Sequence, residues 1–155
     1  MNIKTRKFKD RELIKLVRLA TNVYADILIP KQKHKIFLDI FASDIDEDGC
    51  CTCLDTYDYE IEICKNLSFE HMMITLAHEM VHLKQFSTKQ LKSKFVRGVP
   101  VDTWKGTKYR DIAYQEQPWE KEATLLEESL YEQFLLFGLI NNVIDFDRIK
   151  QIEIS

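Results

Sequence analysis

The sequence predicts a single α+β domain over residues 1–155, built from a small sheet and several helices. The chain has 155 residues, which is one domain's length and enough to bury a hydrophobic core. Hydrophobic residues make up 45% of the chain and charged residues 30%, as in globular proteins. Segments with helical spacing of apolar residues alternate with segments of period two, and no repeat or linker divides them.

The first predicted element is a helix over residues 10–28. Apolar side chains recur there at helical spacing from Leu13 to Ile27, which makes one face of the helix apolar. Asp10 is a suitable N-cap, because its carboxylate can accept hydrogen bonds from the free backbone amides of the first turn. Pro30 follows the helix and ends it.

Three strands are predicted next, over residues 35–42, 50–55 and 58–64. The residues between the first two strands are rich in Asp and end in Gly, which is typical of a turn. The third strand has the clearest pattern, because Tyr59, Ile61 and Ile63 alternate with Glu60, Glu62 and Cys64.

The second half of the chain is predicted to contain two longer helices. The first covers residues 68–87, with Ser68 or Asn66 as its N-cap. Residues 88–117 are polar and contain Gly and Pro, so we expect a long irregular segment with a hairpin around residues 104–106. Pro118 suits the first position of a helix over residues 118–138. Residues 141–155 are predicted to add a short helix and a final strand.

The helix over residues 68–87 carries the sequence His78-Glu79-Met80-Val81-His82. Histidines four residues apart lie one above the other on one helix face, so both imidazoles can reach one metal ion. Glu79 is placed to meet a water on that metal, as in zinc peptidases. The flanking residues are apolar, and a buried His or Glu needs a polar partner, which a metal supplies. The spacing predicts His78 and His82 as metal ligands and Glu79 as the general base.

The third ligand lies outside this motif. A metzincin would carry a His six positions after His82, but Thr88 stands there. His71 lies two helical turns before His78, about 10 Å along the axis, which is too far to share the metal. His34 precedes a predicted strand and is an outside candidate. We therefore expect a carboxylate as the third ligand.

Two carboxylates near the start of the third long helix are candidates for this ligand. Glu120 lies in the first turn beside Trp119, and the small Ala123 one turn later allows close packing against the helix that carries the histidines. Glu122 lies on the opposite flank of the apolar stripe. We prefer Glu120 and keep Glu122 as the alternative.

Residues 75–85, 104–106 and 117–123 together resemble small HExxH proteins encoded by tailed bacteriophages. These proteins belong to the zincin metallopeptidase superfamily and resemble its gluzincin branch, in which a Glu on a later helix is the third ligand. The resemblance covers roughly residues 35–137. It implies a minimal zincin-like domain, with a small sheet, an active-site helix and a later ligand helix, that uses Zn²⁺. Gluzincins often carry an acidic residue four positions after the ligand Glu, where this chain has Thr124.

Other side chains are candidates for supporting roles. A zinc peptidase needs a hydrogen-bond donor for the oxyanion, and Tyr109 and Tyr114 precede the ligand helix. Gln85 lies one turn after His82 and can orient a ligand or the substrate. Four cysteines are either packed thiols or a structural zinc site. They are Cys50, Cys51, Cys53 and Cys64. The adjacent Cys50 and Cys51 are poorly placed to share a metal, because neighbouring residues of a strand point to opposite faces.

Composition and charge narrow the class of protein. No apolar run is long enough to span a bilayer and no secretory signal is evident, so we expect a cytoplasmic protein without a membrane partner, in the host cytoplasm if phage-encoded. The main hypothesis is a zinc-dependent peptidase that cleaves a protein or peptide substrate through a metal-activated water. The alternatives are a non-catalytic zincin-fold binding module and a SprT-like protease that associates with nucleic acid. The net charge of −3 does not favour a protease that associates with nucleic acid, and only the basic character of residues 1–35 supports this alternative.

Overall fold

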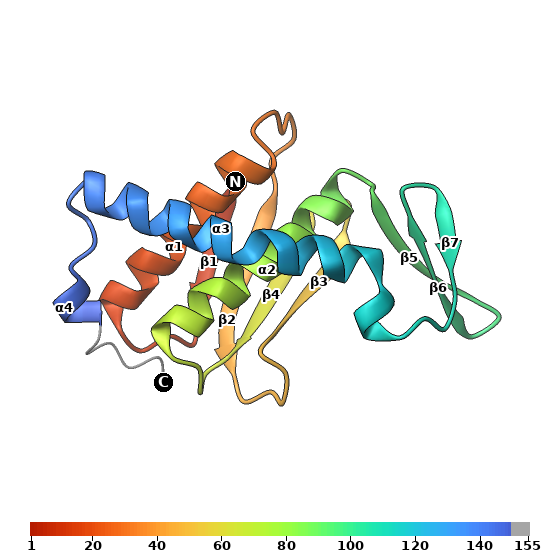
Figure 1. The fold of residues 1–155 in the computed structure, drawn as a ribbon, viewed down its shortest axis with the longest axis horizontal. Helices are drawn as coiled ribbons and strands as arrows, with labels where there is room; N and C mark the ends of the chain where they lie inside the picture. The colour runs from red at the N-terminus through yellow and green to blue at the C-terminus, as the bar shows by residue number, and fades with distance from the viewer. Residues whose placement is uncertain (150–155) are drawn as a thin grey trace.

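The computed structural model describes residues 1–149, and within this range it has four helices and two small sheets (Figure 1). The prediction of an α+β fold is therefore confirmed. The larger sheet has the strand order β1-β2-β4-β3, in which β1, β2 and β4 are parallel and β3 is the antiparallel edge strand. The strands are β1 (Asn2–Arg6), β2 (Phe37–Ser43), β3 (Gly49–Asp55) and β4 (Asp58–Cys64).

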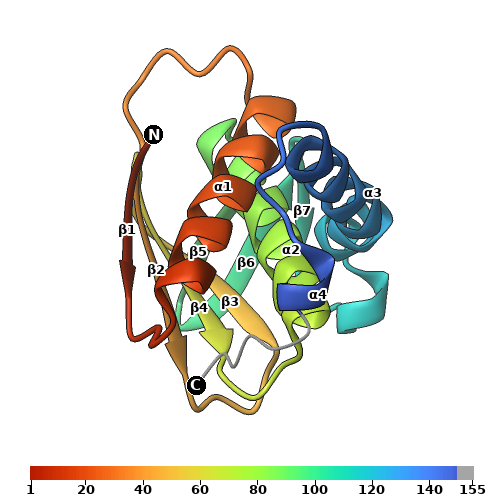
Figure 2. The ribbon, with the colours of Figure 1, turned by 90° about the vertical axis from the view of Figure 1, so that its left-hand side faces the viewer.

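Three long helices lie on one side of this sheet (Figure 2). The first two pack next to the strands, and the third packs on the outside against the other two. The helices are α1 (Arg11–Leu28), α2 (Phe69–Ser87) and α3 (Pro118–Ile140). The core between the helices and the sheet is almost entirely apolar. Its fully buried side chains include Leu13, Val17, Ile40, Ile61, Met73 and Leu76.

The predicted helices are present, and their first residues are capped as expected. The Asp10 carboxylate accepts a hydrogen bond from the backbone amide of Glu12 at 2.7 Å. The Ser68 hydroxyl accepts one from the amide of His71 at 3.3 Å. Pro118 occupies the first position of α3, which runs two residues further than predicted. These ends are determined by local chemistry, and for that reason the sequence predicts them well.

The predicted strands at residues 35–42, 50–55 and 58–64 are also present, with small shifts at their ends. The parallel strand β1 was not predicted. Its side chains alternate, but its charged residues pair across the sheet, as when the Arg6 guanidinium donates to Asp39 at 2.8 Å. A strand that is stabilised by partners 33 residues away has little local signal.

The prediction of an irregular segment over residues 88–117 is largely wrong, because most of this segment forms a second antiparallel sheet. Its strands are polar and exposed on most of their length, and this hides the alternation on which strand prediction depends. The predicted hairpin around residues 104–106 is present, with Lys105 and Gly106 at positive φ in its turn. The strands are β5 (Leu91–Val96), β6 (Val99–Trp104) and β7 (Thr107–Tyr109), followed by the short helix η1 (Tyr114–Glu116).

The C-terminal part of the described chain ends in the short helix α4 (Phe146–Ile149), which was predicted within residues 141–155. The final strand predicted there lies outside the described residues. Within residues 1–149, no helix combines the length and apolar character needed to cross a bilayer.

Candidate metal centre

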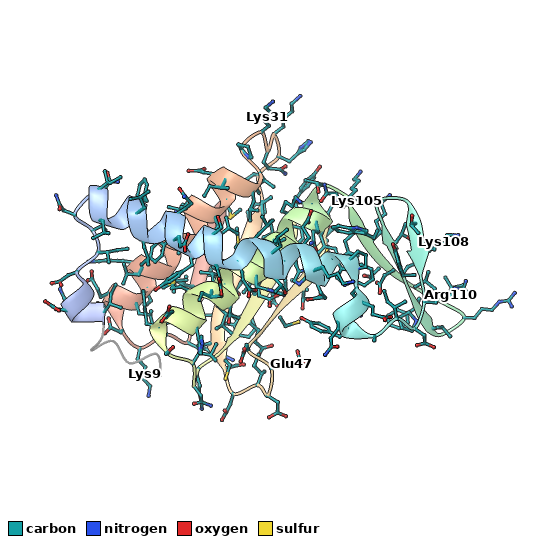
Figure 3. The ribbon with its side chains drawn as sticks, in the orientation of Figure 1. Lys9, Lys31, Glu47, Lys105, Lys108 and Arg110 are labelled. Atoms are coloured by element: carbon teal, nitrogen blue, oxygen red, sulfur yellow. The ribbon has the colours of Figure 1, made fainter. Side chains whose placement is uncertain are left out.

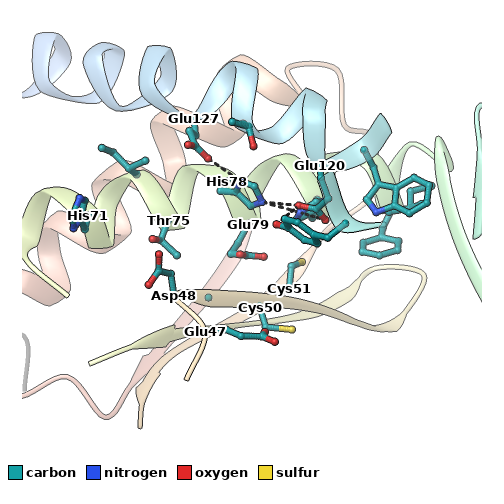
Figure 4. A pocket seen from close by; sticks show the side chains of 18 of the residues that line it. Glu47, Asp48, Cys50, Cys51, His71, Thr75, His78, Glu79, Glu120 and Glu127 are labelled. Carbon is teal, nitrogen blue, oxygen red and sulfur yellow. Dashed lines mark hydrogen bonds and ion pairs between the residues drawn. The ribbon is translucent and has the colours of Figure 1, made fainter. Parts of the chain in front are cut away.

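The two histidines of the motif meet on one face of α2. Figure 4 shows His78 on this helix, above the edge strand β3. The Nε2 atoms of the two histidines are 3.1 Å apart. Both side chains are largely buried, since α2 passes between α3 and the sheet. The i, i+4 spacing thus places the two imidazoles at one point, as the sequence predicts.

Glu120 completes the cluster from the first turn of α3. Its Oε2 lies 3.2 Å from His78 Nε2, and its Oε1 lies 3.3 Å from His82 Nε2. The three ligand atoms all lie within 4.8 Å of one another, and among residues 1–149 this is the single group of three or more such side chains. The His78, His82 and Glu120 group can therefore hold a metal ion.

The hydrogen bonds of Gln85 determine which nitrogen of His82 faces this group. The Gln85 amide nitrogen donates to the backbone carbonyl of Trp119 at 2.9 Å and to Glu122 at 3.0 Å. The amide oxygen is therefore the atom that faces His82 Nδ1, at 2.8 Å. Because that oxygen only accepts, Nδ1 carries a proton and Nε2 is the nitrogen that faces the cluster. Gln85 lies one turn after His82 and contacts it, as its spacing predicts, and it is fully buried.

Glu127 does the same for His78, and the sequence did not indicate it. Its Oε2 lies 2.6 Å from His78 Nδ1, so that nitrogen donates and His78 Nε2 is the nitrogen that faces the cluster. Glu127 is seven residues after Glu120, on the same face of α3 two turns later. That spacing is the signal that could have revealed it. Thr124, where gluzincins often carry an acid, lines the cleft between them.

Glu79 lies in the same cleft but outside the three-residue cluster. Only 6% of its surface is exposed. Burial raises the pKa of Glu79 to about 7, although the imidazoles of His82 and His78 act in the opposite direction. A carboxyl group with this pKa can exchange a proton near neutral pH.

Gly49 allows β3 to approach Glu79 this closely. A Cβ atom at Gly49 would lie 2.6 Å from Thr75 Cγ2 and 3.1 Å from Glu79 Oε1. The first distance is shorter than any ordinary carbon–carbon contact, so the close approach requires a glycine here. Gly49 therefore has a second role besides ending the predicted turn, because it lets strand β3 pack closely against Glu79.

Charges within the cluster are strongly coupled. Burial lowers the pKa of His78, but hydrogen bonds to Glu120 and Glu127 outweigh this effect and raise it to about 9. Burial also acts against the charge of Glu120, yet its hydrogen bonds with His78, His82 and Tyr114 hold the pKa of Glu120 well below its usual range. The metal-free site therefore keeps an ionised carboxylate between two basic imidazoles.

The remaining candidates separate into those near the cluster and those away from it. The Tyr114 hydroxyl donates to Glu120 Oε2 at 2.5 Å, whereas Tyr109 packs edge-on against Trp119. His71 lines the cleft outside the cluster, and His34 stacks on Tyr57. All four cysteines are free thiols, and none belongs to a metal-binding group within the described part of the chain. Cys50 and Cys51 line the cleft.

Glu122, the alternative third ligand, is bound elsewhere. Its Oε2 lies 3.0 Å from Lys84 Nζ, and its Oε1 lies 3.5 Å from Lys105 Nζ.

Replacing Glu120 with Ala should weaken zinc binding by more than about 100-fold, because loss of a ligand exceeds the 10–100-fold cost of losing a ligand's hydrogen-bond partner. Glu122→Ala should cost less than about tenfold, through Gln85 alone. Competition titration with a zinc-sensitive dye measures both. Equal losses would remove Glu120 from the ligand set, and the reverse ranking would assign the ligand to Glu122.

No family model, no curated protein and no solved structure matches this chain. What the site does is therefore inferred from its geometry. The imidazoles of His78 and His82 converge with the Glu120 carboxylate, and the Nδ1 atom of each imidazole is hydrogen-bonded. A second buried carboxyl group, that of Glu79, lines the same cleft.

Proposed function

We propose that the protein is a zinc-dependent peptidase with His78, His82 and Glu120 as ligands and Glu79 as general base. The observation that carries this proposal is the pair of outer hydrogen bonds, from His78 to Glu127 and from His82 to Gln85. Together they hold both imidazoles with Nε2 facing Glu120.

The donor set fits zinc. Catalytic zinc sites use three protein ligands drawn from His, Glu and Cys and leave a position open for water or substrate. Two imidazoles, each giving up its Nε2 proton to the solvent when a metal binds, and one carboxylate would give this arrangement, and each imidazole has the outer partner that such ligands require. When bound, zinc would lower the pKa of water and polarise the scissile carbonyl.

The chain's own residues supply the remaining chemistry. Glu79 accepts the proton of the attacking water and passes it to the amine that leaves. Tyr114 lines the cleft, and its hydroxyl, which donates to Glu120 without a metal, would be released to donate to the developing oxyanion once Glu120 binds the metal. Burial and the Glu120 carboxylate raise the pKa of Tyr114, which keeps this hydroxyl protonated. The protein would act in the cytoplasm, a reducing compartment in which its four thiols stay free.

Glu79 favours an enzyme over a non-catalytic binding module. A metal site that only stabilises structure does not need a base, and burying a carboxyl group without a full set of partners is costly. The cleft beside Glu79 also gives a substrate access to the cluster. A nucleic-acid-associated protease of the SprT-like type stays a weaker alternative, which a salt-dependent DNA shift would support.

The proposal is tested by removing the metal. Treating the protein with a zinc chelator should abolish cleavage of a mixed peptide library, and adding one equivalent of Zn²⁺ should restore it, with products read by mass spectrometry. Magnesium at the same concentration serves as the control and should restore nothing, because it prefers oxygen ligands. Cleavage that survives complete removal of zinc would contradict the proposal. A zinc-loaded protein that cleaves no peptide would support the binding module.

A further inference from the structure

The cleft around the metal cluster is lined by an unusual set of charges. It has a volume of about 960 Å³ and extends along α2 from His71 to Phe86. Apart from Glu79, Glu120 and Glu127, it contains five more carboxylates and, among its described lining residues, no Lys or Arg. The whole chain, by contrast, has 22 Lys and Arg against 25 Asp and Glu. The excess of negative charge is therefore a property of the cleft. The five carboxylates belong to Asp46, Glu47, Asp48, Asp102 and Glu128.

These five carboxylates have no cationic partner within the described residues. Within residues 1–149, none of the five lies within 4.0 Å of a Lys, Arg or His nitrogen, whereas the nearby Asp44 pairs with Lys65 at 3.1 Å. Asp102 alone of the five has a side-chain partner, the hydroxyl of Ser93 at 2.6 Å. Their charge is thus available to a ligand that enters the cleft.

The surface cations labelled in Figure 3 do not line the cleft. Lys105, Lys108 and Arg110 lie in and beside the small β5–β7 sheet, and Lys31 lies on the loop after α1. Glu47, in contrast, lies on the loop between β2 and β3, below the metal cluster in Figure 4. A cleft with charge of one sign concentrates counter-charged ligands, and the effect is stronger where the walls are of low polarity.

The acids are also unevenly distributed along the cleft. Asp46, Glu47 and Asp48 come from the loop that leads into Gly49, and Gly49 packs against Thr75 in the N-terminal half of α2. Near the C-terminal half of α2, an apolar group that packs together also lines the cleft. The apolar group consists of Phe86, Leu91 and Trp119.

We propose that the substrate of this cleft is a basic peptide, with Lys or Arg side chains bound by the loop Asp46–Asp48 on one side of the scissile bond. The metal cluster determines where in the cleft the peptide would be cleaved. The acidic side chains determine which charge the bound peptide carries. That the bound peptide is cleaved rests on the proposed peptidase function. The preference for a positively charged peptide does not depend on it. A cationic side chain would lie at the acidic loop while the apolar group receives an uncharged side chain.

The test uses the full chain loaded with zinc. Wild-type protein should cleave a randomised peptide library with Lys or Arg enriched at one position beside the cleaved bond. In the triple variant Asp46→Asn, Glu47→Gln, Asp48→Asn, the ratio of kcat/KM for a basic peptide to that for its neutral analogue should fall about tenfold or more. Rising ionic strength should lower the same ratio for the wild type. The matched control Asp26→Asn, Asp58→Asn, Glu132→Gln changes charge equally at exposed positions outside the cleft, and it should leave the ratio unchanged.

Binding measured without turnover separates this proposal from the peptidase proposal. Zinc-loaded Glu79→Gln protein should bind a fluorescent Lys-rich peptide at least tenfold more tightly than a Glu-rich peptide of equal length, and the acid-loop triple change should remove the difference. Basic-peptide binding by a protein that cleaves nothing would leave the charge proposal standing and end the peptidase proposal. Cleavage or binding with no preference for Lys or Arg, or a preference that survives the triple change, would overturn the charge proposal alone.

Discussion

Replacing His82 with Ala should leave the protein unable to retain zinc at one equivalent per chain. His82 Nε2 is one of three converging ligand atoms, and the hydrogen bond to Gln85 holds it facing the cluster. Changing only a ligand's hydrogen-bond partner costs about 10–100-fold in metal affinity, so removing the ligand should cost more than 100-fold. His78→Ala should have the same effect, because His78 also offers one of the three converging ligand atoms. Elemental analysis of protein purified without added metal and dialysed against a weak chelator measures the loss.

His71→Ala is the matched control for these two variants. His71 also lies on α2 and lines the cleft, but it is exposed and outside the cluster. It should keep a full equivalent of zinc. If His78→Ala and His82→Ala each keep a full equivalent as well, the ligand assignment is wrong and the cysteines become the leading metal site. Circular dichroism on all three variants shows whether the loss of zinc occurs in a folded chain.

The parts of the site that the sequence predicts are those that depend on local geometry. The spacing of His78 and His82 on one helix face follows from the helical repeat alone. Glu120 was reached by excluding other donors and by its place in the first turn of α3, and the structure brings it to both imidazoles. Helix α3 could be predicted because Pro118 and the apolar stripe are local signals.

The parts that the sequence does not predict depend on contacts between distant segments. Glu127 is an ordinary helix carboxylate until α3 lies against α2, when its Oε2 reaches His78 Nδ1. Strand β1 is held by pairing with β2, 35 residues further along in register, and by ion pairs to Asp39. The acidic character of the cleft likewise appears only when the loop Asp46–Asp48 and Glu128 face the same space. Local pattern cannot report such long-range pairing.

Burial gives Glu79 properties that a surface glutamate lacks. The ordinary pKa of a glutamate is near 4.5, and burial raises that of Glu79 to about 7. Above its unfolded-state pKa, ionisation of this group therefore opposes folding, and the cost grows as the pH rises towards 7 and levels off above it. An amide of the same shape carries no charge and does not have this cost. Replacing Glu79 with Gln should hold the melting temperature or raise it at neutral pH.

The same Glu79→Gln change should lower peptidase activity by about 100-fold or more, because the amide cannot accept the proton of the attacking water. Zinc content should stay at the wild-type value, since Glu79 lies outside the cluster of ligand atoms. The measurement is kcat with the best library peptide, together with zinc per chain on the same samples. Glu127→Gln is an informative comparison, because it alters the partner of His78 and should weaken zinc binding as well as activity. If Glu79→Gln loses zinc along with activity, Glu79 coordinates the metal directly. If it keeps both zinc and full activity, another group is the base.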